Sequence, residues 1–159
     1  MPYRDILART TARYLRVRPD GLEIAPGHQP RPHLVATIFD HGPARTCYQN
    51  RRPVCRSLDG IHALGNPNLH CHPCDLRPQC TPQVRLSLAI DDSPYQLLLA
   101  FTSAQNFIAY LAQLENTGHH LEDVPTRLVV INHRSWGEVR FEIADRGGQP
   151  NRLNPTETE

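Results

Sequence analysis

Apolar and polar side chains alternate along several short stretches of this chain. Apolar residues occupy every second position from 84 to 90, and this period of two predicts a strand with one buried face. Strands are also predicted at 33–40, 95–101, 125–131 and 136–143, where apolar and β-branched side chains are dense. The Asp-Asp-Ser-Pro run at 91–94 predicts a turn between two of these strands.

A helical period replaces the alternation after residue 101. The helical face consists of Phe107, Ile108, Leu111 and Leu114. Thr102 lies three residues before Gln105, a spacing that predicts a capping box at the start of the helix. Gly118 predicts its C-terminal cap, because glycine accepts the left-handed backbone that ends many helices.

The two ends of the chain have patterns of their own. The turn sequence Arg-Pro-Asp-Gly at 18–21 predicts a hairpin between strands at 12–17 and 22–24. The spacing of apolar residues within 3–15 also fits a helix, so the secondary structure of the residues before the hairpin is left undecided. Residues 1–32 are therefore interpreted as an N-terminal hairpin and extension. Residues 145–159 are polar and rich in glycine, proline and asparagine, which predicts a disordered tail.

The order from residue 33 onward is strand, long insert, two strands, helix and two strands. This is the order of an OB-fold, so we predict a mainly β domain at 33–144 with one helix and a five-stranded barrel. The insert, at about 41–83, would lie between the first and second strands. An α+β sheet with one packed helix fits the same order and is the alternative.

The insert shows little periodicity and holds all five cysteines of the chain. So long an irregular segment needs something other than a core to order it. Cys71 and Cys74 form a C-x2-C knuckle, and with Cys55 and Cys80 they predict a closed, structural zinc site with four thiolates. Cys47, His70 or His72 are alternatives for one of these ligands, and an iron–sulfur cluster would use the same thiolates.

Composition and charge narrow the class of function. The 159 residues include 17 arginines and no lysine, and the net charge is +6 over residues 1–56 but −5 over 57–159. Recognised enzyme motifs are absent, so we expect a protein that is not an enzyme. The longest apolar stretch has five residues, far below the about 20 that span a bilayer. Without an apolar signal segment, a cytoplasmic location is expected.

Arginines interleaved with aromatic residues indicate a surface for single-stranded nucleic acid, because they neutralise phosphates and offer planes for stacking. The candidate contacts are Arg45, Tyr48, Arg51, Arg52 and Arg56 in the insert, Arg85, Arg127 and Arg140 on outward strand positions, and Arg134 and Trp136 at a hairpin. The alternative function is a zinc-stabilised adaptor whose arginines meet an acidic protein within a larger complex.

Several of these runs resemble a family of small zinc-binding proteins of phages and integrative conjugative elements. The matching features are Cys-Arg-Ser-Leu-Asp-Gly at 55–60, the cysteines at 71, 74 and 80, Arg-Leu at 85–86, the apolar strand ending at 102–103 and the helix with Phe107 and Tyr110. The resemblance covers about 53–144 and departs at Leu58, at the extra Cys47 and in a shorter spacing before Cys80. It implies zinc on the four cysteines, single-stranded DNA as partner, and other proteins of a replication or mobile-element complex.

Overall fold

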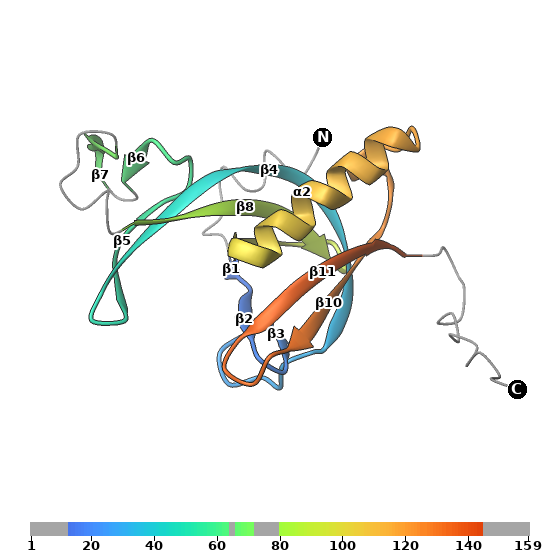
Figure 1. Ribbon diagram of the computed structural model, residues 1–159, viewed down its shortest axis with the longest axis horizontal. Coiled ribbons are helices and arrows are strands. Elements are labelled where there is room, and N and C mark those ends of the chain that lie inside the picture. The colour runs from blue at the N-terminus through green and yellow to red at the C-terminus, as the bar shows by residue number, and fades with distance from the viewer. Residues whose placement is uncertain (1–12, 64–65, 72–79, 145–159) are drawn as a thin grey trace, which may run out of the picture.

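The computed structural model describes residues 13–63, 66–71 and 80–144 (Figure 1). The strands are β1 (Arg13–Tyr14), β2 (Arg16–Arg18), β3 (Gly21–Glu23), β4 (His33–Gln49), β5 (Arg52–Ser57), β6 (His62–Ala63), β7 (Asn66–His70), β8 (Cys80–Ile90), β9 (Ser93–Ala100), β10 (Thr126–Asn132) and β11 (Gly137–Ile143). The described residues contain one α-helix, α2 (Phe101–Asn116), and a short 3-10 helix, η2 (Leu121–Asp123). The predicted tail at 145–159 and most of the open segment 3–15 lie outside these ranges.

The fold is mainly β with one helix, as the sequence predicts. Seven strands form one mixed sheet in the order β1-β9-β8-β4-β10-β11, with β5 added to β4. The hairpin predicted at 18–21 is present, since β2 and β3 pair antiparallel from Arg16 to Glu23. The turn predicted between β8 and β9 is also present, with Asp91 and Asp92 at positive φ angles of 48° and 64°.

The long strand β4 joins the two halves of the sheet. Its first residues pair with β10 (Ala36 with Thr126), and its later residues pair with β8, from Thr37 with Ala89 onward. A register shift between Ile38 and Asp40 lies within the pairing with β8, close to where the pairing with β10 ends, and such irregularities bend a strand.

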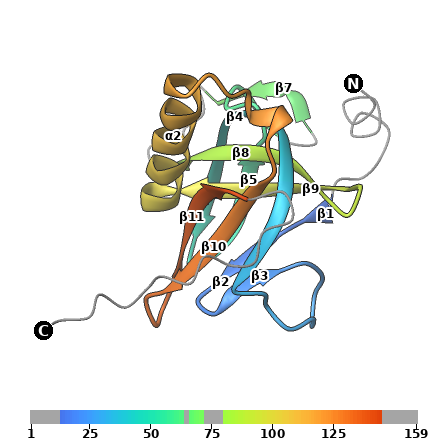
Figure 2. The ribbon, with the colours of Figure 1, turned by 90° about the vertical axis from the view of Figure 1, so that its right-hand side faces the viewer.

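The five-stranded barrel is not confirmed. Closure of the sheet would require β9 and β11 to pair, and no such pairing occurs among the described residues. Instead β1 pairs in parallel with the outer edge of β9. Figure 2 shows α2 on one side of the curved sheet and the hairpin β2–β3 beside the ends of β10 and β11. We call the gap between β9 and β11 the seam.

Side chains of α2 cover the edge of β11 at the seam. The Val139 backbone N–H donates to Ser103 Oγ at 2.9 Å, and the Val139 carbonyl accepts from Asn106 Nδ2 at 3.0 Å. A Cβ at Gly137 would collide with the carbonyl oxygen of Arg18 on β2. The two hydrogen bonds satisfy backbone groups on the edge of β11. In a closed barrel, pairing with a neighbouring strand would satisfy the groups along this edge.

The helix differs from its sequence-based description at the N-terminus and on one face. Its N-cap is Ala100, which makes no side-chain cap hydrogen bond, so the capping box predicted at Thr102 is wrong. Tyr110 is buried on the packed face, whereas Ile108 is 58% exposed. The C-terminal prediction is confirmed, because Gly118 has a φ of 73° and its N–H donates to the Glu115 carbonyl.

The main apolar cluster lies under α2 and includes no described residue of the predicted insert. The main cluster of buried apolar side chains, drawn from the described residues, contains none between Ile38 and Val84. The insert is nevertheless largely strand, because β4 continues to Gln49, β5 follows, and β8 begins at Cys80. Its prediction as an irregular segment was wrong, since one partner of the extended β4, the strand β8, lies far away in sequence.

No helix in the described residues is long and apolar enough to cross a membrane.

Candidate nucleic-acid interface and cysteine row

The outer half of β4 and all of β5 form a hairpin that extends away from α2 (Figure 1). We call residues 41–57 the arm. Gln49 pairs with Arg52 at its tip, and the two residues between them, Asn50 and Arg51, have φ angles of 49° and 64°. Two positive φ angles in a two-residue loop favour asparagine and glycine. Arg51 therefore holds a position where glycine is the more stable residue.

The arm is positively charged, and its own residues include no acid. Four arginines lie between Asp40 and Asp59, and no aspartate or glutamate occurs among these residues. Arg51 and Arg52 are exposed at the tip, with Tyr48 beside them at 42% exposure. Three of the predicted contacts thus lie together on the outermost part of the hairpin.

The other two predicted contacts of the arm, Arg45 and Arg56, are half-buried nearer its base. The Arg56 guanidinium carbon lies 5.4 Å from the centre of the Tyr14 ring, within reach of a cation–π contact with β1. The Arg56 Nε is buried and has no hydrogen-bond partner among the described residues. Arg56 therefore contributes to the contact between the arm and the N-terminal segment.

Arg85 is embedded in the sheet rather than presented on its surface. Its side chain is 17% exposed and lies over Gly42, where it donates to the Leu58 carbonyl at 2.9 Å. It also donates to Ser87 Oγ at 2.8 Å and pairs with Asp40 at 3.4 Å. Its guanidinium is therefore paired within the fold rather than presented to a ligand.

The outward arginines of the last two strands are paired with carboxylates. Arg127 on β10 lies opposite Glu142 on β11 and 3.3 Å from it, and Arg140 lies 2.6 Å from Glu138. The sequence placed Arg127 and Arg140 on the correct strands, but each positive charge is balanced locally. The unbalanced charge of the candidate surface is therefore concentrated in the arm.

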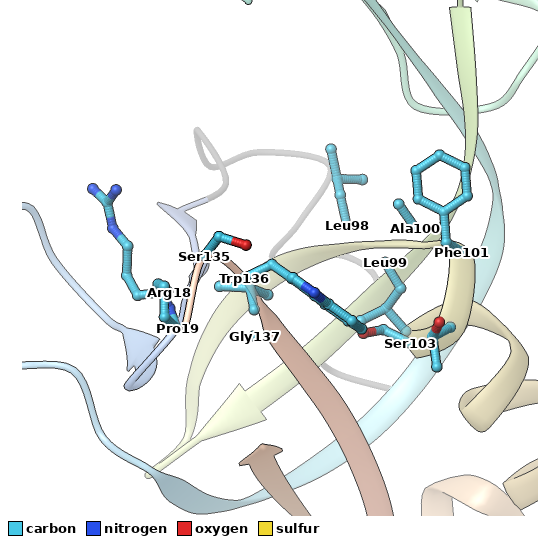
Figure 3. A pocket seen from close by; sticks show the side chains of 12 residues that line it. Arg18, Pro19, Leu98, Leu99, Ala100, Phe101, Ser103, Ser135, Trp136 and Gly137 are labelled. Atoms are coloured by element: carbon cyan, nitrogen blue, oxygen red, sulfur yellow. The ribbon is translucent and has the colours of Figure 1, made fainter. Parts of the chain in front are cut away.

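Trp136 and Arg134 lie at the connection between β10 and β11. Arg134 is exposed, with a φ of 71°. The Trp136 ring stacks on His133 with centroids 4.3 Å apart and lines a pocket at the seam (Figure 3).

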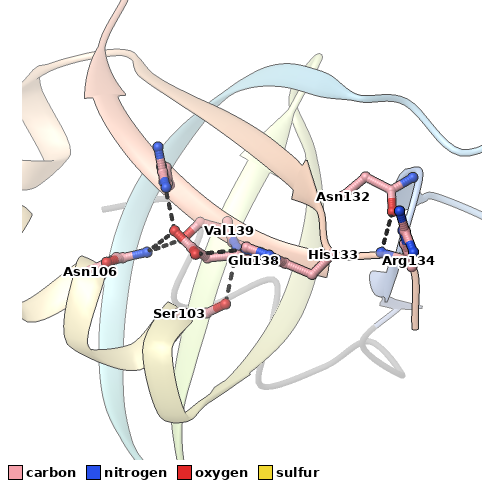
Figure 4. A network of polar contacts seen from close by, with 8 residues as sticks. Ser103, Asn106, Asn132, His133, Arg134, Glu138 and Val139 are labelled. Atoms are coloured by element: carbon pink, nitrogen blue, oxygen red, sulfur yellow. Dashed lines mark hydrogen bonds and ion pairs between the residues drawn. The ribbon is translucent and has the colours of Figure 1, made fainter. Parts of the chain in front are cut away.

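A buried carboxylate holds this connection against α2 (Figure 4). Glu138 accepts from Arg140 at 2.6 Å and from Asn106 at 3.1 Å, and its other oxygen lies 3.0 Å from His133 Nε2. These hydrogen bonds, that of Arg140 foremost, lower the pKa of Glu138 from its ordinary 4.5 to about 2. Glu138 thus stays ionised and fixes the imidazole beneath Trp136.

The sheet register brings three cysteines into one row. Cys47 pairs with Cys55 across β4–β5 and with Cys80 across β4–β8. Directly paired residues in antiparallel strands project from the same face, so Cys47 lies between the other two. Cys55 and Cys80 are separated by two strand spacings, about 10 Å. Zinc binds each thiolate at about 2.3 Å, so two thiolates on one ion lie within about 4.6 Å of each other. Cys47 is one strand spacing from each outer cysteine, whereas the outer two are twice as far from each other.

The remaining predicted ligands lie at the end of β7 or beyond it. The Cys71 N–H donates to the Ile61 carbonyl at 2.6 Å, and the ring of His70 lies 4.8 Å from that of His62. Cys74 and His72 fall outside the described residues. Within the described ranges, no group of three or more histidine, cysteine or acidic side chains is arranged to hold a metal ion.

Asp59 shapes the loop that leads from the arm toward Cys71. Its carboxylate accepts from Ser57 Oγ and from the backbone N–H groups of Ile61 and His62, and it lies 2.8 Å from His62 Nδ1. These bonds, the backbone N–H of His62 foremost, hold the pKa of Asp59 well below its ordinary value. The Asp-Gly pair at 59–60 signals a turn, but no local pattern signals the histidine partner.

No protein-family model matches the chain, and comparisons with curated proteins and with solved structures found no match. The resemblance to the mobile-element family stays a prediction.

Proposed function

We propose that this protein binds single-stranded nucleic acid, in the first place DNA, through the arm and without catalysing a reaction. The observation that carries the proposal is the tip of the β4–β5 hairpin. It presents Arg51, Arg52 and Tyr48 at the end of the arm, whose residues include four arginines and no acid. Cations for the phosphates and an exposed ring for a base are the two components that an unpaired strand requires.

The backbone at the tip supports the same proposal. Arg51 occupies a left-handed position, which costs a residue other than glycine roughly 1 kcal/mol. Conformational strain of this kind is concentrated at functional sites. A guanidinium held at the outermost point of the hairpin can approach a phosphate without contact from the rest of the fold.

We further propose a structural zinc that fixes the arm to the segment after β7, in a protein of the reducing cytoplasm. Cys71 and Cys74 would supply the knuckle. The cysteine row supports Cys47, with Cys55 or Cys80, as the other side of the site. The arm lies outside the main core, so its order would depend on this metal more than on apolar burial.

The experiment is an oligonucleotide titration at two salt concentrations, with single-stranded and duplex DNA compared. The variant is Arg51→Gly combined with Arg52→Ala. Glycine suits the turn at 51, so the variant should fold at least as well as the natural chain. We expect weaker binding and a salt slope that is smaller by about 1.4, the share of two phosphates on a single strand.

The control is Arg127→Ala, which removes one positive charge from a position already paired with Glu142. It should leave affinity and slope nearly unchanged. A double variant that binds with the natural slope would refute the role of the arm. Folded protein that binds no oligonucleotide at low salt would refute the proposed function and favour an acidic protein as the partner.

A further inference from the structure

A pocket of about 480 Å³ opens at the seam, where the sheet does not close (Figure 3). Its walls come from β2, from the end of β9 with the start of α2, and from the β10–β11 connection. Its volume lies in the range of small-molecule binding sites. The pocket exists because β9 and β11 do not pair, so its presence follows from the open sheet.

One wall of the pocket is the indole of Trp136, which contacts within the fold hold in one orientation. His133 stacks on Trp136 at an interplanar angle of 14°, and Glu138 holds His133 from behind. Trp136 remains 45% exposed while it lines the pocket. Figure 3 shows its ring directed from the connection toward Leu99 and Ser103. A fixed and partly exposed ring offers a stacking surface at little cost in side-chain entropy.

A second aromatic side chain lines the same pocket. Phe101, the first residue of α2, is 72% exposed and has a φ of 46°. A bulky residue rarely adopts positive φ, and core packing does not explain a phenyl ring so far in solvent. The pocket thus combines two large exposed aromatic groups that the fold itself does not require.

The polar lining is neutral or basic. Thr102 and Ser135 contribute hydroxyl groups, and none of the described residues that line the pocket is acidic. Arg18 also lines the pocket, but its Nε is paired with Glu23 at 3.1 Å. Aromatic planes and hydroxyl groups match the flat ring and the polar edges of a nucleic-acid base.

We propose that the seam pocket binds one unpaired base of the nucleic-acid strand, stacked on Trp136 with Phe101 as a second apolar wall. This inference rests on the proposed function and adds a second contact to the arm. The arm would supply phosphate neutralisation, and the pocket would supply stacking. Binding would then distinguish an unpaired strand from a duplex, whose bases are already stacked.

Trp136 is the only tryptophan of the chain, so its fluorescence reports on this pocket alone. The experiment adds oligothymidylate, and separately an abasic oligonucleotide of equal length, to the full chain. Anisotropy of a dye on each oligonucleotide measures binding independently. We expect oligothymidylate to quench Trp136, and the abasic strand to bind more weakly without quenching.

Phe101→Ala retains the fluorescent reporter and should weaken oligothymidylate binding about tenfold, within the range for loss of one stacked base. The matched control is Ile108→Ala, which removes another exposed apolar side chain of α2 outside the pocket; it should bind normally. Oligothymidylate that raises anisotropy but leaves Trp136 fluorescence unchanged would overturn the pocket and leave the proposed function intact. No anisotropy change at low salt would overturn both.

Discussion

Glu138 connects three separate parts of the molecule through one carboxylate. It accepts hydrogen bonds from Asn106 on α2 and from Arg140 on its own strand, and it is hydrogen-bonded to His133 in the β10–β11 connection. A buried carboxylate is stable as an anion only where such partners replace water. Because the partners act on the charged form, they stabilise the folded state only while Glu138 is ionised.

Stability should therefore depend on pH through this residue. The pKa of Glu138 is about 2 in the folded chain and 4.5 ordinarily. Its stabilisation should be complete above about pH 5 and should disappear as the pH falls from 4.5 to about 2. Thermal unfolding of the natural chain and of Glu138→Gln across this window should show a difference in stability that shrinks to nothing at the acid end.

The control, Glu142→Gln, alters an exposed carboxylate of the same strand and should show a small difference. A Glu138→Gln difference that is equal at pH 6 and pH 2 contradicts the assignment.

The arginines show why the phase of a strand does not reveal a binding surface. Alternation with apolar neighbours placed Arg127 and Arg140 outward, and both are on strands as expected. Whether an outward charge is available depends on its neighbour across the sheet, such as Glu142 opposite Arg127. That neighbour is set by register, which the pattern within one strand does not contain.

At the scale of elements, the first turn of α2 serves the edge of the sheet rather than its own end. The sequence assigned a capping role to Thr102. In the fold the adjacent hydroxyl, that of the buried Ser103, accepts the Val139 N–H on β11. The helix thereby covers part of the open edge of the sheet.

Substitution of Thr102 and of Ser103 tests whether the first turn of the helix caps its own N-terminus or bonds to the edge of β11. Ser103→Ala would leave the Val139 N–H buried without a partner and should cost about 1–3 kcal/mol in the free energy of unfolding. Thr102→Ala removes no cap hydrogen bond and should cost less than about 0.5 kcal/mol. Urea denaturation measures both. A larger loss of stability for Thr102→Ala than for Ser103→Ala would support the capping box and contradict the contact between Ser103 and Val139.

The main apolar core of the molecule lies in the body, and the arm contributes no residue to it. The main apolar cluster of the described residues spans the sheet under α2 and stops before β5. The arm contains Cys47 and Cys55 instead, and Cys47 also pairs with Cys80 on β8. Stability should accordingly come from apolar burial in the body and, under our proposal, from metal binding in the arm.

This division predicts a local response to loss of metal. Cys47→Ser and Cys71→Ser should each lower the zinc content of purified protein. A chelator should speed amide hydrogen exchange in 41–57 while α2 stays protected, because its core contacts do not involve the metal. Thr81→Ala, adjacent to Cys80 on the opposite face, should retain the metal. Full zinc content in Cys47→Ser would exclude Cys47 as a ligand, and natural protein without zinc would refute the metal site.

Local pattern was sufficient for most of the elements. Alternation at 84–90, the turn at 18–21 and Gly118 each report a property of neighbouring residues, such as which face is buried or which φ is tolerated. Mainly β architecture with one helix followed from the same information. The excess of arginine in the arm is likewise a feature of the sequence alone.

The pairing of distant residues was decided only in the tertiary structure. Cys47 lies between Cys55 and Cys80, Arg85 reaches the Leu58 carbonyl, and Glu138 meets Asn106 because strands and helix pack in one particular register. The open seam and its pocket arise in the same way, from edges that do not meet. Periodicity records the environment of each segment along the chain, whereas a site depends on which segments the fold brings together.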